Sequence, residues 1–438
     1  MTGGKHREPT PPAVLLPSDL EHVRLLIRWA VVAVVFGVIS GCVVHGIREL
    51  LLLFVSLREL SPGPLFFTLP AIGAAINGFA VYPLDREARG DGVYTYIKVA
   101  GNTREQLGIR FVLLKTLATL ATIGSGARGG LVGPLVAIHA GIGVTLARRF
   151  PFFARFVSEG QMNLRPSAVC GAAGAVGALL LAPLGGGVFA VEILFGGALA
   201  YAALFPAILT STTACFVSAA LRGAFPRTIW TRPEFSMSPN GELLILVLAA
   251  SVIAGVVGIL FVFLNKRLPH FLEKRAVPHG LRPVIGAVLA TALALTIGKE
   301  VFYTGTDLFA AEIPLLLETP GALPVLSLFV LMVGIALAVG FVVGGSGSGG
   351  LTMPAMTLGV LSGALVAGIF SVPPAESLPL LVAGMTACLA SSLNVPIAAA
   401  VISLEVFGAG TAYAAVLGSV IGYQMGRGHL MYRYLKRP

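Results

Sequence analysis

The sequence predicts an all-α membrane protein with several spanning helices, built from two related halves. Hydrophobic residues make up 56% of the 438 residues and charged residues only 11%, whereas a soluble domain carries about 25% charged residues. Apolar stretches recur along the chain, and a span needs roughly 20 such residues. These stretches lie at 29–55, 64–82, 168–196, 199–222, 242–264, 283–298, 323–343 and, in pieces, 375–425.

Two motifs that each occur twice, in the same order, indicate an internal duplication. Residues 130–134 (Gly-Leu-Val-Gly-Pro) match 350–354 (Gly-Leu-Thr-Met-Pro), and a Gly-Ser-Gly stands shortly before each. A proline followed nine residues later by a glutamate occurs at 183–192 and again at 396–405. Interrupted hydrophobic segments at matching positions of two halves are typical of a transport site.

We expect the chain to divide at its polar segments. The expected parts are a polar cytoplasmic N-terminus (1–19), a first transmembrane repeat (20–221), a linker (222–240) and a second repeat (241–438), with no C-terminal regulatory domain. Helices that break inside the membrane favour repeats of inverted topology. Basic residues gather outside the spans, so both termini are expected in the cytoplasm, with a bacterial inner membrane as the host. This placement of charge argues against nucleic-acid binding.

Each glycine-rich segment is predicted to precede a helix that starts inside the protein. Glycine costs about 1 kcal/mol and proline about 3 kcal/mol in a helix interior, but proline fits the first turn. Such a helix start presents free N–H groups and a positive dipole end, which bind anions. The sequence therefore predicts an anion pathway between two mirrored helix starts. It contains no nucleophile–base pair, phosphate loop or metal-ligand spacing, so neither enzymatic activity nor a cofactor or metal is expected.

At these motifs the sequence resembles the CLC family of chloride channels and chloride/proton antiporters, over nearly the whole transmembrane portion. The residues that carry the resemblance are Gly90–Tyr94 at the family's G-S-G-I-P, Lys115 at its intramembrane lysine, Gly130–Pro134 at G-[RK]-E-G-P, Ala182–Glu192 at its "APL…E" helix, Gly350–Pro354 at G-x-F-x-P and Tyr432 at its pore tyrosine. Tyr434 is the alternative to Tyr432. The resemblance implies a CLC fold with two inverted repeats whose broken helices meet at the midplane, and a homodimer in the lipid bilayer with one pore per subunit.

The resemblance also implies where chloride or a similar monovalent anion binds. Backbone N–H groups and hydroxyl groups would hold the dehydrated ion. The corresponding positions here are Asp91, Gly92, Val93, Gly130, Leu131, Val132, Gly133, Leu351, Thr352, Met353 and Tyr432. Lys115 and Arg128 are expected to set the electrostatic potential of the pore.

Two departures from the family concern proton transfer. The family's external gate is the glutamate of G-[RK]-E-G-P, and its antiporters use a second glutamate on the inner side. Val132 and Ile193 stand at these positions, and neither side chain ionises. Glu192 has a counterpart in Glu405, which favours a structural role for both as acceptors of N–H bonds at helix starts. The alternative is that Glu192 or another acid replaces the missing gate.

Two further departures concern the anion itself. Asp91 replaces the family's anion-coordinating serine, and a carboxylate about 4 Å from chloride would repel it by about 4 kcal/mol at an effective dielectric constant of 20. Asp91 could be protonated through desolvation, paired with Arg128 or Lys115, or turned away from the pore. The alternative for Arg128 is an exposed residue at the rim. Thr352 replaces a phenylalanine and predicts a wider inner vestibule.

These observations together predict a passive, proton-uncoupled chloride channel. One alternative is a chloride/proton antiporter in which Asp91 serves as the protonatable group. The other is a non-conducting binding or sensory membrane protein with the same fold.

Overall fold

The computed structural model describes residues 19–101, 107–150, 165–223, 241–302 and 325–436. Within these ranges the protein is built of helices, and the β pairing consists of a single antiparallel bridge between Gly130 and Gly350. The polar N-terminal segment up to residue 18 and the linker from residue 224 lie outside the described residues, so the predictions for them are not tested.

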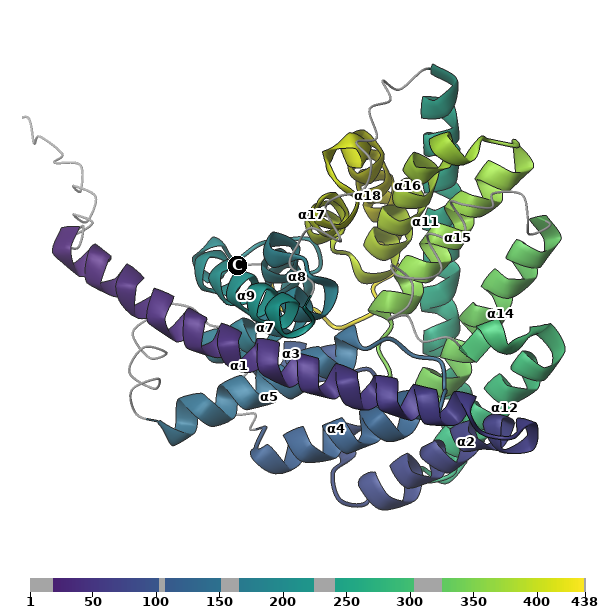
Figure 1. The fold of residues 1–438 in the computed structure, drawn as a ribbon, viewed down its shortest axis with the longest axis horizontal. Helices are drawn as coiled ribbons and strands as arrows, with labels where there is room; N and C mark the ends of the chain where they lie inside the picture. The colour runs from purple at the N-terminus through teal and green to yellow at the C-terminus, as the bar shows by residue number, and fades with distance from the viewer. Residues whose placement is uncertain (1–18, 102–106, 151–164, 224–240, 303–324, 437–438) are drawn as a thin grey trace, which may run out of the picture.

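The first half of the chain, purple to teal in Figure 1, begins with one long helix that crosses in front of the others. Its elements are α1 (Asp19–Glu59), α2 (Gly63–Ala75), η1 (Ile76–Val81), η2 (Arg86–Ala88), α3 (Val93–Gly101), α4 (Ile109–Gly124), α5 (Val132–Arg149), α7 (Pro166–Leu180), α8 (Pro183–Phe195) and α9 (Tyr201–Leu221).

The second half, green to yellow in Figure 1, gathers on the opposite side of the molecule. Its elements are α11 (Gly241–Lys274), α12 (Arg282–Ile297), η3 (Lys299–Phe302), α14 (Val325–Gly344), α15 (Thr352–Ile369), α16 (Pro374–Leu393), α17 (Pro396–Phe407), η6 (Ala409–Thr411) and α18 (Ala412–Gly426). The chain after α18 returns to the first half, where the Leu435 N–H donates to the Leu194 carbonyl over 2.8 Å.

The helices have the lengths and surfaces of membrane spans. Seven of the described helical segments are long and apolar enough to cross a bilayer, and four shorter apolar helices accompany them. Large apolar side chains such as Ile27, Val31 and Leu53 on α1 remain exposed, which suits a surface that faces lipid. The predicted polytopic all-α architecture is confirmed. The predicted stretch 168–196 is two helices, α7 and α8, separated by a break.

The two halves break their helices at matching places. Leu181 ends α7 and Asn394 ends α16, both in the left-handed region with φ of 52° and 56°. Gly126 and Ser346 also have positive φ, of 100° and 73°, and each stands four residues before a glycine of the 130–350 bridge. A non-glycine residue rarely adopts this conformation. These breaks let α5 and α15 start in the interior, whereas α8 and α17 start at partly exposed places, where Leu184 and Ile397 are 49% and 44% exposed.

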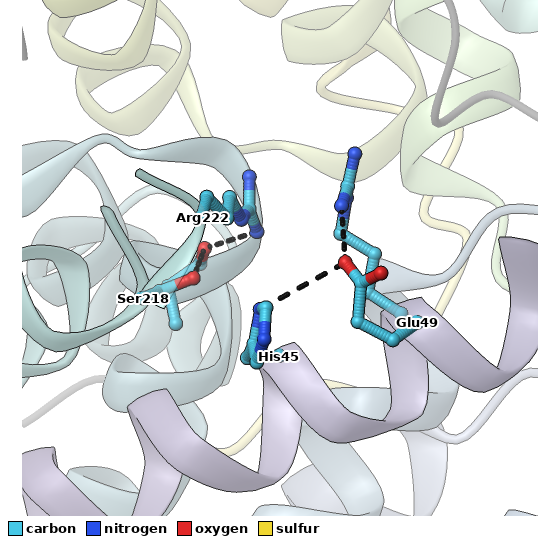
Figure 2. A network of polar contacts seen from close by, with 6 residues as sticks. His45, Glu49, Ser218 and Arg222 are labelled. Carbon is cyan, nitrogen blue, oxygen red and sulfur yellow. Dashed lines mark hydrogen bonds and ion pairs between the residues drawn. The ribbon is translucent and has the colours of Figure 1, made fainter. Parts of the chain in front are cut away.

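A polar cluster on the flank of the molecule holds the end of α7 in place. Figure 2 shows His45 and Glu49 of α1 next to Ser218 and Arg222 at the end of α9. Ser218 and Arg222 both donate to the carbonyl of Ala178, over 3.0 and 2.9 Å. The last carbonyls of a helix have no partner inside the helix. These two bonds therefore fix the turn from which α8 begins.

Candidate functional site

The two duplicated glycine segments are joined to each other by backbone hydrogen bonds. The Gly130 N–H donates to the Gly350 carbonyl over 2.8 Å, and the Gly350 N–H donates to the Gly130 carbonyl over 2.6 Å. A side chain on Gly130 would collide with Met353 and Pro354 at the start of α15. The bridge therefore sets the starts of α5 and α15 against each other, although they are far apart in the sequence.

The start of α3 joins them. Gly92 has φ of +48°, and a Cβ atom on it would overlap the Gly133 carbonyl. A Cβ atom on Gly133 would in turn overlap Oδ1 of Asp91. Gly133 also lies against Gly350, whose own Cβ would lie 2.6 Å from the Gly133 nitrogen. Three helix starts thus converge around Gly133, which must lack a side chain for them to do so.

The starts of α5 and α15 carry no side-chain cap. Their N-cap residues are Leu131 and Leu351, whose apolar side chains give neither helix a cap of its own. Leu131, Val132, Leu351 and Thr352 are all at most 2% exposed. First-turn N–H groups need acceptors, and a buried helix end without them is unusual. Together with the positive dipole end, this is a site for a negative group.

Tyr432 and Asp91 meet at these helix starts. The Tyr432 hydroxyl donates to Oδ2 of Asp91, and the tyrosine is 8% exposed. The Tyr434 hydroxyl instead donates to the Leu393 carbonyl over 2.7 Å, at the end of α16. Of the two candidate tyrosines, the structure therefore places Tyr432 at the converging helix starts, while Tyr434 braces the C-terminal segment.

The two candidate cations occupy different surroundings. Lys115, fully buried on α4, donates to the Gly90 carbonyl over 2.6 Å and interacts electrostatically with Asp91. Arg128 is 1% exposed and donates to the Glu300 carbonyl over 3.1 Å. The alternative that Arg128 is an exposed rim residue is therefore wrong. Lys115 is the cation seen to act on Asp91, whereas a pairing of Asp91 with Arg128 stays a prediction.

The hydroxyl of Thr352 is a further polar group at this site. Thr352 is completely buried, and within the described residues its Oγ1 has no hydrogen-bond partner. An isolated buried hydroxyl is costly. Its place at the uncapped start of α15 suits a group that binds an anion or a water molecule.

Sequence reasoning missed a set of small polar residues that hold the second glycine segment. Oγ1 of Thr119 and Oγ of Ser348 lie 3.0 Å apart. The Ser348 N–H donates to Oγ1 of Thr122 over 3.3 Å, and Nδ2 of Asn77 reaches the same hydroxyl over 3.3 Å. The sequence did contain an indication of this contact. Two threonines three residues apart on the apolar helix α4 share one helix face.

The paired glutamates lie apart from these converging starts and cap other helices. Glu192 of α8 accepts from the N–H groups of Ile397 and Ala398, over 3.1 and 2.7 Å. Glu405 of α17 accepts from Leu184 and Gly185, over 2.7 and 2.8 Å. This is the geometry that the expected bracing role requires.

The exchange of caps also gives the direction of the two helices. Each glutamate sits near the end of its own helix and reaches the start of the other, so α8 and α17 run antiparallel. Because they are equivalent elements of the two halves, the halves point in opposite directions. Ile193, next to Glu192, is fully buried.

Comparisons with known proteins identify relatives of this chain. Residues 73–427 match the voltage gated chloride channel family. The chain is 26% identical over 415 residues to an uncharacterized protein of Methanocaldococcus jannaschii, covering 94% of this chain and 96% of that protein. It is 25% identical over 431 residues to the voltage-gated ClC-type chloride channel ClcB of Escherichia coli, covering 92% and 97%.

Solved structures share the fold. A CLC-type fluoride/proton antiporter superposes with a TM-score of 0.79 at 21% identity, covering 97% of this chain and 100% of that one. A slow cyanobacterial Cl⁻/H⁺ antiporter gives a TM-score of 0.73 at 18% identity, covering 92% and 94%.

The fold and the converging helix starts define a multi-pass membrane protein of the anion-transporting class. The chain belongs to the CLC family, the voltage gated chloride channel family, whose members are anion channels and transporters rather than enzymes. The predicted family and fold class are confirmed.

Proposed function

We propose that this protein is a passive, proton-uncoupled channel for chloride and similar monovalent anions. It works as a homodimer in the lipid bilayer with one pore per subunit, in a bacterial inner membrane with both termini cytoplasmic. The observation that carries the proposal is the pair of buried, uncapped helix starts at α5 and α15. These starts offer N–H groups and positive potential to an ion that replaces its hydration shell with them.

The absence of proton coupling is supported by the side chains at the two gate positions. Val132 is 1% exposed and Ile193 is fully buried, and both are hydrocarbon. Neither can exchange a proton. Both oxygens of Glu192 accept backbone N–H groups of α17, so this carboxylate is committed to its cap and is a poor substitute for the missing gate.

A coupled antiporter is the second candidate, because one carboxylate does reach the site. Oδ1 of Asp91 is closed off from solvent and has no hydrogen-bond partner within the described residues, so a proton could bind there. Two solved structures of similar fold are of antiporters. The third candidate, a non-conducting binding or sensory protein, is disfavoured by the preserved helix starts and Tyr432.

Flux from liposomes separates the three candidates. Purified protein is reconstituted with a chloride gradient, the membrane potential is clamped, and chloride and proton movements are recorded together. We expect fast chloride efflux with no accompanying proton movement. Stoichiometric proton transport against its gradient would instead establish the antiporter, and complete absence of flux beside an active CLC control would favour the binding protein.

A further inference from the structure

The position of the Asp91 carboxylate has a functional consequence. Its Oδ2 accepts the Tyr432 hydroxyl, and its Oδ1 lies against the backbone of Gly133 at the start of α5. The backbone N–H groups of Val93 and Leu351, at the starts of α3 and α15, also interact with it. The carboxylate therefore touches all three converging helix starts and the pore tyrosine.

This is the place where the site would hold a free anion. Anions bind at helix starts because N–H groups and the positive dipole end point at them. A carboxylate satisfies the same groups as chloride does, and it is attached to the chain. A second negative charge beside it would be repelled, since Coulomb repulsion is large in a poorly solvated interior.

We propose that Asp91 is a built-in anion that occupies the site between the starts of α3, α5 and α15 and competes there with the permeant anion. Chloride enters this position when the carboxylate swings out or takes up a proton. The gating carboxylate is thus carried by the loop before α3 and not by the first residue of α5, which is Val132. The inference rests on the proposed anion pathway and names the residue that controls its occupancy.

The groups around Asp91 fit a carboxylate that can leave or be neutralised. Lys115 on α4 and the tyrosines Tyr432 and Tyr434 of the C-terminal segment are the ionisable groups that act on it or feel its charge. The contacts from α3, α5 and α15 are backbone groups of Val93, Gly133 and Leu351. Lys115 offsets its charge, but among the described residues Oδ1 makes no close hydrogen bond beyond the looser approach of the Val93 and Leu351 N–H groups.

Coupling does not follow from a protonatable Asp91 alone. An antiporter must pass the proton on to the opposite side of the membrane, and the two gate positions hold Val132 and Ile193. A single carboxylate that exchanges a proton with one side opens and closes the site without carrying protons across. The inference is therefore compatible with a passive channel and predicts that acid favours anion binding.

Anion binding to purified protein tests this inference. Isothermal titration with potassium chloride at pH 7.5 compares the wild type with Asp91→Asn, which keeps the shape and removes the charge, and with Asp91→Ser. Asp85→Asn is the matched control, because Asp85 carries the same charge and caps η2 outside the site. We expect Asp91→Asn and Asp91→Ser to bind chloride at least tenfold more tightly than the wild type, and Asp85→Asn to match the wild type.

Equal affinity in the wild type and both Asp91 variants would overturn the inference, as would an equal gain in Asp85→Asn. If the Asp91 variants do not fold, a density map of the wild type in bromide decides the question. At pH 9, where the carboxylate is ionised, bromide between Tyr432 and Gly133 with Asp91 unmoved would contradict the inference, whereas the carboxylate in that place without bromide supports it. Liposome flux tests the channel separately: flux without any Asp91 effect on binding removes only the inference, and tighter binding without flux removes only the channel.

Discussion

Two pairs of helices start at matching breaks in the two halves, and the two pairs of starts are capped differently. The starts of α8 and α17 each receive a glutamate from the other half, with both carboxylate oxygens bonded to backbone N–H groups. The starts of α5 and α15 begin at apolar residues and have no side-chain cap. The first pair is neutralised by carboxylates and serves as scaffold, whereas the second pair is the place where we propose that an anion binds.

Asp91 shares features with both the capped and the uncapped helix starts. Like Glu192 and Glu405, it brings a carboxylate to the starts of helices that are not its own. Unlike them, it retains one oxygen without a hydrogen bond in the described part of the chain. The difference fits the proposed division of roles: Glu192 and Glu405 are fully bonded, and Asp91, which we propose leaves its place to admit an anion, is only partly bonded.

Removal of a permanent cap should have the largest effect. Glu405→Ala removes the acceptor of the buried Gly185 N–H and of the partly buried Leu184 N–H. Each unmade bond of this kind costs about 1–3 kcal/mol, so for two bonds we expect a loss of about 2–6 kcal/mol in the free energy of unfolding, measured by denaturant unfolding in detergent. Glu242→Ala, at the exposed start of α11, is the control and should change stability by less than about 0.5 kcal/mol. Equal effects of the two variants would remove the distinction between capped and uncapped starts.

A carboxylate introduced at the uncapped start of α5 should block the anion pathway. In Val132→Glu the new side chain can occupy the start of α5, so we expect chloride flux at pH 7.5 to fall at least about tenfold, a change of about 1.4 kcal/mol or more. Acidification should restore the flux as the carboxylate takes up a proton. Val132→Gln has the same size without the charge and should show no such pH dependence. Identical flux–pH curves for the two variants would contradict the assignment of Val132 to the gate position.

Removal of either buried cation, Lys115 or Arg128, should change chloride conductance by a smaller amount. Because Lys115 acts on Asp91, we expect Lys115→Met to lower chloride conductance several-fold, while Arg128→Met has a weaker effect through the potential of the pore. Arg110→Met, on an exposed position of α4, is the control for loss of one positive charge. If Arg128→Met leaves both conductance and anion selectivity unchanged, the electrostatic role predicted for Arg128 is wrong.

The smallest effect is expected at the loop between α11 and α12. The pKa of the imidazole of His279 is lowered from 6.5, first by desolvation and then by the positive charges of Arg282, Arg89 and Arg86. The unfolded chain therefore binds this proton more readily than the folded protein, so stability falls as the pH drops below about 6.5.

His279→Gln should weaken that fall, by about 1 °C in the unfolding midpoint between pH 7 and pH 5. Thermal scans across this range measure it, with His270→Gln on α11 as the control for loss of an imidazole. A steeper fall in His279→Gln would mean that the imidazole is stabilised in its charged form.

Much of the candidate site could be predicted from short-range patterns in the chain. The glycine segments before α5 and α15 predicted interior helix starts, because glycine and proline disfavour a continuous helix wherever they occur. The repeated proline–glutamate spacing likewise predicted a shared role for Glu192 and Glu405. The pattern did not show which helix each glutamate caps. No residue near Glu192 in the sequence indicates that its carboxylate bonds to α17, in the other half of the chain.

The sequence by itself determined the membrane class, the duplication and the places where helices break, because hydropathy and backbone preferences depend on neighbouring residues. Only the tertiary structure decided that Tyr432 and not Tyr434 meets Asp91, that Lys115 acts on this carboxylate, and that the halves exchange their caps. These contacts join residues separated by many helices. Their existence depends on how the two halves pack around Gly130 and Gly350, which no local pattern specifies.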